Sequence, residues 1–186
     1  FWGGKPVLTV EHAEISKKDG YTYYKYIKQS GGSFNLKDNF LSLPVDILLV
    51  GGGGCGGATS LISIGPGGGG AGGYVSLTAI PGENVTYDVT IGDGAVGDDW
   101  NPYGSTTKNF SLSNGQNSTI TSRSSQTDIV VAYGGGGGTD YLGSGNGGDT
   151  SSNIGSGGGG SGADPSSNIS GGAGGTYLEL DAIASD

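Results

Sequence analysis

Two aromatic residues in a polar, turn-rich stretch are the side chains of this sequence best suited to contact another molecule. Residues 97–104 contain Asp98, Asp99, Trp100 and Tyr103. Trp and Tyr bury large areas at a low cost in conformational entropy, so this stretch favours contact with another molecule. The alternative is that Trp100 folds back over neighbouring strands, and the sequence leaves both interpretations open.

Two apolar stretches are weaker candidates for the same kind of contact. Ile62 lies in the apolar run of residues 61–64, between two glycine blocks, and Tyr141 is followed by Leu142. Each stretch could form a docking patch or fill space between glycine-rich segments. We therefore treat Ile62, Tyr141 and Leu142 as further receptor-binding candidates.

A calcium site is the one metal site that the sequence suggests. Residues 135–143 fit a nonapeptide calcium-binding pattern, and Asp149 follows Asp140 by nine residues. The next position of the repeat holds Gly158 where an acid is expected, and such patterns arise easily by chance in glycine-saturated chains. Asp140 and Asp149 are weak calcium candidates, and we expect neither a metal nor a cofactor.

Catalytic side chains are few. His12 is the only histidine and Cys55 the only cysteine, and no third residue is suggested that would orient such a pair. Cys55 lies within a glycine block, where a small apolar side chain suffices. No phosphate-binding loop of the type that ends in Gly-Lys-Ser/Thr is present in the sequence. The sequence predicts that the protein is not an enzyme.

The composition restricts the elements that could hold these residues. Glycine supplies 43 of the 186 residues, and only 13% are charged, where about 25% is usual. Glycine is costly inside helices and strands, so an ordinary helical or α/β domain is excluded. The glycines come in blocks rather than at every third position, which excludes collagen.

The charge is unevenly distributed. The formal net charge is −9, which disfavours a nucleic-acid partner. Residues 1–44 carry six lysines and four acids, whereas residues 45–186 carry two cations and thirteen acids. The longest apolar run, residues 45–50, has the length of a strand, so we expect no membrane insertion.

Short runs rich in β-branched and aromatic residues predict an all-β framework with almost no α-helix. Residues 1–50 are expected to form a β-rich N-terminal docking part, and residues 51–186 a glycine-rich domain that is continuous with the strands of residues 20–50. Pro81-Gly82 and the triplet of residues 92–94 are expected to be turns between strands. The expected strands are residues 5–10, 21–28, 33–36, 45–50, 74–80, 84–91, 118–121, 128–133 and 176–180.

Five glycine blocks separate these runs, at residues 51–57, 65–73, 134–148, 155–162 and 171–175. A chain in the polyproline II conformation has three residues per turn and directs its backbone polar groups sideways. Where side chains are absent, such helices can lie close together and hydrogen-bond to one another, which satisfies a buried backbone. We expect a polyglycine II bundle attached to small antiparallel sheets or a sandwich.

The order of the motifs resembles that of the glycine-rich domain of tailed-bacteriophage tail proteins. The stretches that carry the resemblance are YTYYKY (residues 21–26), SGGSFNL (30–36), VDILLVGGGG (45–54), GGGGAGGYV (67–75), IPGE (80–83), YDVTIGDG (87–94), GQNSTI (115–120) and AYGGGGG (132–138). The resemblance implies tail-fibre tip adhesins, in which loops at the distal end of a polyglycine II bundle contact the bacterial receptor.

The functional hypothesis is accordingly a virion protein at the particle surface that contributes to host attachment. Its expected partners are other virion proteins of the tail fibre or capsid and a bacterial surface receptor, with a homo-oligomer as a further possibility. Two alternatives stay open. One is a capsid-decorating or fibre-shaft protein without a receptor, and the other is a self-assembling subunit of a cell-surface filament.

Overall fold

The computed structural model describes residues 7–27, 31–37, 43–56, 68–82, 84–96 and 114–138. These residues form nine strands and no helix, as the runs of β-branched and aromatic residues predict. The all-β prediction is confirmed for this part of the chain. The expected strand at residues 176–180 lies outside the described residues, and the division of the chain at residue 50 stays a prediction.

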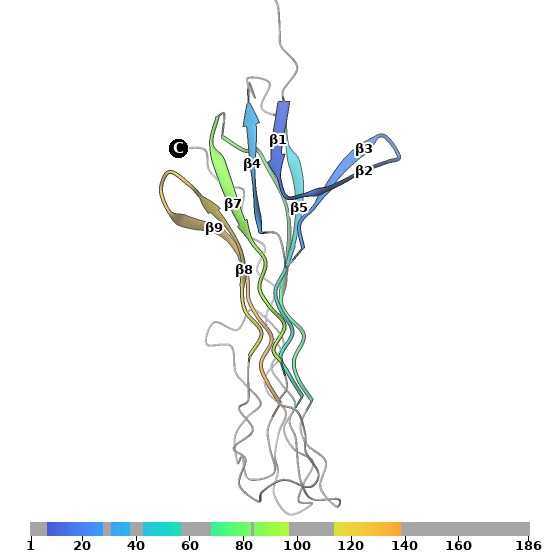
Figure 1. The fold of residues 1–186 in the computed structure, drawn as a ribbon, viewed down its shortest axis with the longest axis vertical. Helices are drawn as coiled ribbons and strands as arrows, with labels where there is room; N and C mark the ends of the chain where they lie inside the picture. Colours follow the sequence, from blue (N-terminus) through green and yellow to red (C-terminus); the bar gives the residue numbers. More distant parts are fainter. Residues whose placement is uncertain are drawn as a thin grey trace, which may run out of the picture.

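A five-stranded antiparallel sheet has the order β1-β4-β7-β8-β9 (Figure 1). Its strands are β1 (Val7–Glu11), β4 (Gly32–Lys37), β7 (Thr86–Thr90), β8 (Ser118–Ser122) and β9 (Thr127–Ala132). Hairpins join few of these neighbours, so the sheet brings together residues that are far apart in the chain: Phe34 of β4 pairs with Tyr87 of β7.

Two further pairs of strands complete the fold. β5 (Val45–Val50) pairs with β6 (Tyr74–Ala79), and β2 (Glu14–Lys18) pairs with β3 (Tyr21–Lys25), in both cases antiparallel. β2 was not among the expected strands. All five of its side chains are exposed, so the strand carries no alternation of apolar and polar residues that a sequence pattern could show.

The core lies between the five-stranded sheet and the β5–β6 pair. Alternate residues of each strand face inward, as they do in a sandwich. The rings of Phe34 and Tyr87 are stacked, with centroids 5.0 Å apart. The buried core residues are Leu49, Val75, Tyr87, Val89, Ile120, Val130 and Ala132.

Candidate functional site

Five segments, most of them rich in glycine, leave the sheets in the same direction and run side by side, and we call them the stem (Figure 1). They are residues 51–56, 68–73, 92–96, 114–117 and 133–138. None belongs to a helix or strand, yet their backbones hydrogen-bond to one another. The triplet of residues 92–94 was expected to be a turn; the structure instead places it in the stem, where Asp93 O accepts from Gln116 N.

The segment of residues 51–56 pairs with that of residues 68–73 in opposite directions. Gly51 N donates to Gly73 O and Gly54 N to Gly70 O, both at 2.8 Å. The hydrogen bonds therefore recur every three residues. In a β-ladder the side-chain period is two, so this pairing is not that of a sheet.

The same segment pairs with residues 133–138 in the parallel sense, again with a spacing of three. Gly135 N donates to Gly52 O and Gly138 N to Cys55 O, both at 2.8 Å. Residues 51–56 thus have one parallel and one antiparallel neighbour at the same time.

The two remaining segments complete the set of neighbours. Ala95 N donates to Gly53 O at 2.8 Å, and Gly52 N donates to Gln116 O at 2.9 Å. Residues 51–56 therefore hydrogen-bond to all four other segments, whereas a strand in a sheet has at most two neighbours. The stem is a three-dimensional network of backbone hydrogen bonds.

Close approach of the backbones explains why these positions are glycine. A Cβ added to Gly52 would lie within 3.0 Å of the Asp93 backbone, and one added to Gly54 within 3.0 Å of the Gly136 backbone. At Gly53 the nearest atom to an added Cβ is Gly70 O at 3.7 Å, an ordinary contact. Glycine is thus required at some stem positions and not at others.

Two asparagine side chains accept hydrogen bonds from backbone N–H groups of the stem. Gly134 N donates to Asn117 Oδ1 at 3.0 Å, and Gly137 N donates to Asn114 Oδ1 at 2.9 Å. The sequence analysis did not assign these asparagines to the bundle. They follow a stretch without a glycine block, so composition carried no signal for them.

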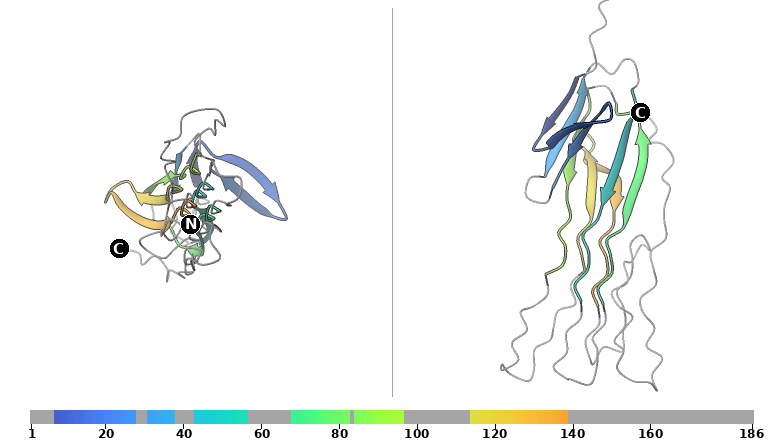
Figure 2. Two further views of the ribbon diagram at one scale, coloured as in Figure 1. Left: turned by 90° about the horizontal axis from the view of Figure 1, so that it is seen from below. Right: turned by 90° about the vertical axis from the view of Figure 1, so that its right-hand side faces the viewer.

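The end of the stem that points away from the sheets is where the candidate loops attach. The described segments stop there at Gly56, Val96 and Gly138, and start again at Gly68 and Asn114. Figure 2 shows this common end from a second side. The stretches of residues 57–67 and 97–113 are therefore attached to this end of the stem at both of their ends, and residue 139 follows the stem at the same end.

All of the receptor-binding candidates lie outside the described residues, in those stretches. They are Ile62, Asp98, Asp99, Trp100, Tyr103, Tyr141 and Leu142. The weak calcium candidates Asp140 and Asp149 also lie outside the described part. Within the described ranges, no three His, Cys, Asp or Glu side chains are grouped as metal ligands.

His12 and Cys55 lie in different parts of the molecule. His12 is exposed between β1 and β2, and Cys55 is buried in the stem. No helix within the described ranges is long and apolar enough to cross a membrane.

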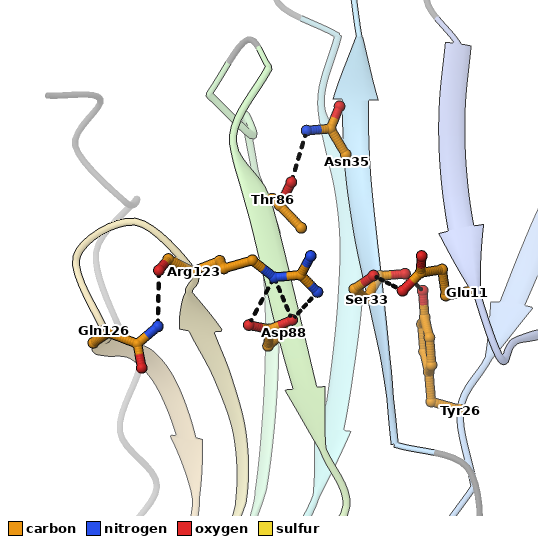
Figure 3. Close-up of polar contacts among 8 residues, drawn as sticks. All are labelled: Glu11, Tyr26, Ser33, Asn35, Thr86, Asp88, Arg123 and Gln126. Atoms are coloured by element: carbon orange, nitrogen blue, oxygen red, sulfur yellow. Dashed lines mark hydrogen bonds and ion pairs between the residues drawn. The ribbon is translucent and has the colours of Figure 1, made fainter.

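Apart from the stem, a polar surface covers the outer face of the five-stranded sheet (Figure 3). Arg123 Nε donates to both carboxylate oxygens of Asp88 at 3.1 Å, and Ser33 Oγ donates to Glu11 Oε2 at 2.8 Å. The hydrogen bond from Arg123 is the main cause that lowers the pKa of Asp88 below its usual range. The alternation of polar residues along β1, β4 and β7 could have predicted this face.

A shallow hollow of about 180 Å³ opens on this face. Asn35 Nδ2 donates to Thr86 Oγ1 at 3.1 Å, while the buried Asn35 Oδ1 has no hydrogen-bond partner among the residues that the structure describes. The lining residues are Thr9, Glu11, Ser33, Asn35, Lys37, Thr86 and Arg123. The surface offers hydrogen-bond donors and acceptors from β1, β4 and β7.

Comparison with known families identifies a glycine-rich domain. A family model described as a glycine-rich domain matches residues 29–183, which is most of the chain. Searches of curated proteins and of solved structures find no match.

Proposed function

The chain belongs to the glycine-rich domain family, and from that premise we propose that it is a non-enzymatic adhesin of a tailed-phage particle. The protein is displayed at the virion surface, on a tail fibre or tail tip, and its loops bind a receptor on the host bacterium. The phage source rests on the resemblance in motif order, from YTYYKY at residues 21–26 to AYGGGGG at residues 132–138.

We further propose that the stem is a polyglycine II bundle. The three-residue repeat of its hydrogen bonds supports this, because a polyproline II helix returns to the same direction every three residues. Four neighbours around one segment, both parallel and antiparallel, fit a bundle of such helices. Backbone bonding throughout makes the stem a stiff support for whatever its end carries.

The observation that carries the adhesin proposal is the attachment of every candidate loop to one end of the stem. Residues 56, 68, 96, 114 and 138 all lie at that end, away from the sheets. At about 3.6 Å per residue, Trp100 lies within about 14 Å of Val96 and Tyr141 within about 11 Å of Gly138, in any conformation. The candidates can therefore form one contact surface, and a stiff support lowers the ordering cost of binding.

The test is adsorption of the native particle to its host. We expect antibodies against the chain to label the tail tip or fibre, and the purified protein to block adsorption as its concentration rises. Labelling of the capsid with no effect on adsorption would overturn the proposal in favour of a decorating protein. Polymerisation of the protein without any particle would instead favour the filament subunit.

A further inference from the structure

The β2–β3 hairpin, residues 14–25, stands away from the rest of the molecule, and we call it the arm (Figures 1 and 2). β2 and β3 pair only with each other. A two-stranded hairpin is marginally stable in water unless something covers it. Among the described residues, the packing of the arm is therefore incomplete.

The base of the arm is nevertheless fixed to the five-stranded sheet. The Tyr26 hydroxyl donates to Ser33 O at 3.0 Å (Figure 3), and a Cβ added to Gly32 would lie within 3.0 Å of the Tyr26 ring. Burial, with smaller contributions from Tyr24 and Glu11, raises the pKa of Tyr26 to about 12, so this donor stays protonated. The arm is held at a defined position before any partner arrives.

One face of the arm presents two tyrosines. Register places Tyr23 opposite Ser16 and Tyr21 opposite Lys18, on the same face. The side chains of Tyr21 and Tyr23 are 65% and 48% exposed, and their ring centroids lie 6.4 Å apart. An exposed aromatic pair on a pre-positioned element is typical of an interaction surface.

A second apolar surface lies on the outer face of the β5–β6 pair. Leu48 and Val50 are 69% and 53% exposed, and Tyr74 pairs with Val50 across the two strands. Their neighbours Leu49 and Val75 face inward to the core. This outer face is as wide as the arm, since each consists of two strands.

We propose that the arm of one copy docks on the outer face of β5–β6 of a second copy. Local charge favours this occupant, because Lys18 lies opposite Tyr21 on the tyrosine face of the arm and Asp46 is exposed on the outer face of β5. Asp46 Oδ1 accepts from Thr78 Oγ1 at 2.6 Å, and the second carboxylate oxygen can accept from Lys18 of the partner arm. The arm points away from its own molecule, so the contact is between copies (Figure 2).

Such a contact joins two different surfaces and leaves each copy with one arm and one face for further partners. Contacts of this kind close into rings or continue as filaments. The proposal is independent of receptor binding, because the arm and the face belong to the strands and the candidate loops attach at the far end of the stem.

The test uses two double variants of the full chain. Tyr21→Ser with Tyr23→Ser removes the arm surface, and Leu48→Ser with Val50→Ser removes the face. We expect the wild type to self-associate at concentrations on the order of 100 µM, and each variant to be monomeric by light scattering. An equal mixture of the two variants keeps one intact arm and one intact face, so we expect a one-to-one dimer.

The control is Val96→Ser, which changes a side chain that is 79% exposed at the loop-bearing end and should leave association unchanged. Unfolding midpoints of all the variants establish that each is folded. A monomeric wild type, variants that still associate, or a mixture that stays monomeric would each overturn the proposal. Adsorption measurements with the monomeric variants report separately on the receptor-binding loops.

Discussion

Ser118 joins the strands to the stem through a single buried hydroxyl. Its Oγ donates to Val50 O at 2.6 Å and accepts from Gly92 N at 2.9 Å. Val50 ends β5 and Gly92 begins a stem segment, so this hydroxyl lies where two chains leave the sheets. The side chain has no exposed surface, so water cannot replace it in either hydrogen bond.

We predict that Ser118→Ala lowers the free energy of unfolding by about 1–3 kcal/mol, because it removes two partly buried hydrogen bonds, one to Val50 O and one from Gly92 N. Urea unfolding at neutral pH measures the effect. Ser76→Ala is the matched control, since Ser76 is exposed on β6. Equal effects of the two substitutions would show that the hydroxyl makes no special contribution at the junction.

The ion pair between Arg123 and Asp88 gives a pH dependence. Because the pKa of Asp88 is lowered in the folded protein, its contribution is present above the pKa of an unfolded aspartate, about 4, and is lost as the pH falls through the folded value. We predict that Asp88→Asn lowers the urea midpoint at pH 7 and that its difference from the wild type shrinks below pH of about 4. A difference that persists at low pH would assign the effect to packing. The ion pair is exposed, so we expect the difference in urea midpoint to be small.

Among the elements, the stem shows which glycines are required. We predict that Gly52→Ala lowers the unfolding free energy by about 1–3 kcal/mol through overpacking against the Asp93 backbone. Gly53→Ala, the neighbouring control, should change it by less than about 1 kcal/mol in either direction, since its added Cβ meets Gly70 O at an ordinary distance. Thermal and urea unfolding compare them. A neutral Gly52→Ala would contradict the packing of this segment.

Most strands could be predicted because their side chains alternate or form apolar runs. β5 and β9 are examples, with buried Leu49 and Val130. β2 could not, because exposure on both faces removes the pattern. Backbone hydrogen bonding between glycine blocks was predicted and is found for the described parts of the blocks at residues 51–57, 65–73 and 134–148, while the blocks at residues 155–162 and 171–175 lie outside the described residues. The part played by residues 92–96 and 114–117 was not predicted, because it depends on neighbours distant in the chain. The candidate loops stay a prediction from their residue types.

For the whole molecule, the arrangement separates two roles in space. The strands hold the arm and the polar sheet face at one end, and the stem carries the attachment points of the candidate loops at the other (Figure 1). A substitution in a loop should therefore affect receptor binding without affecting stability.

We predict that Trp100→Ala combined with Tyr103→Ala reduces the blocking of adsorption by the purified protein at least tenfold, since large aromatic side chains dominate contact surfaces. The midpoint of unfolding should stay close to that of the wild type. Ile80→Ala is the control, because Ile80 is exposed at the strand end. A fall in stability with the double variant would indicate instead that Trp100 covers the strands.

The three-residue repeat of the stem also sets a rule for its length. Insertion or removal of whole triplets in all of the segments would restore every neighbour relation, because each backbone group would again face the same partner segment. In the proposed polyglycine II conformation, one triplet adds about 9 Å. The distance between the sheets and the loop attachment points could therefore change in fixed steps. The orientation of the loops about the long axis of the stem would stay constant.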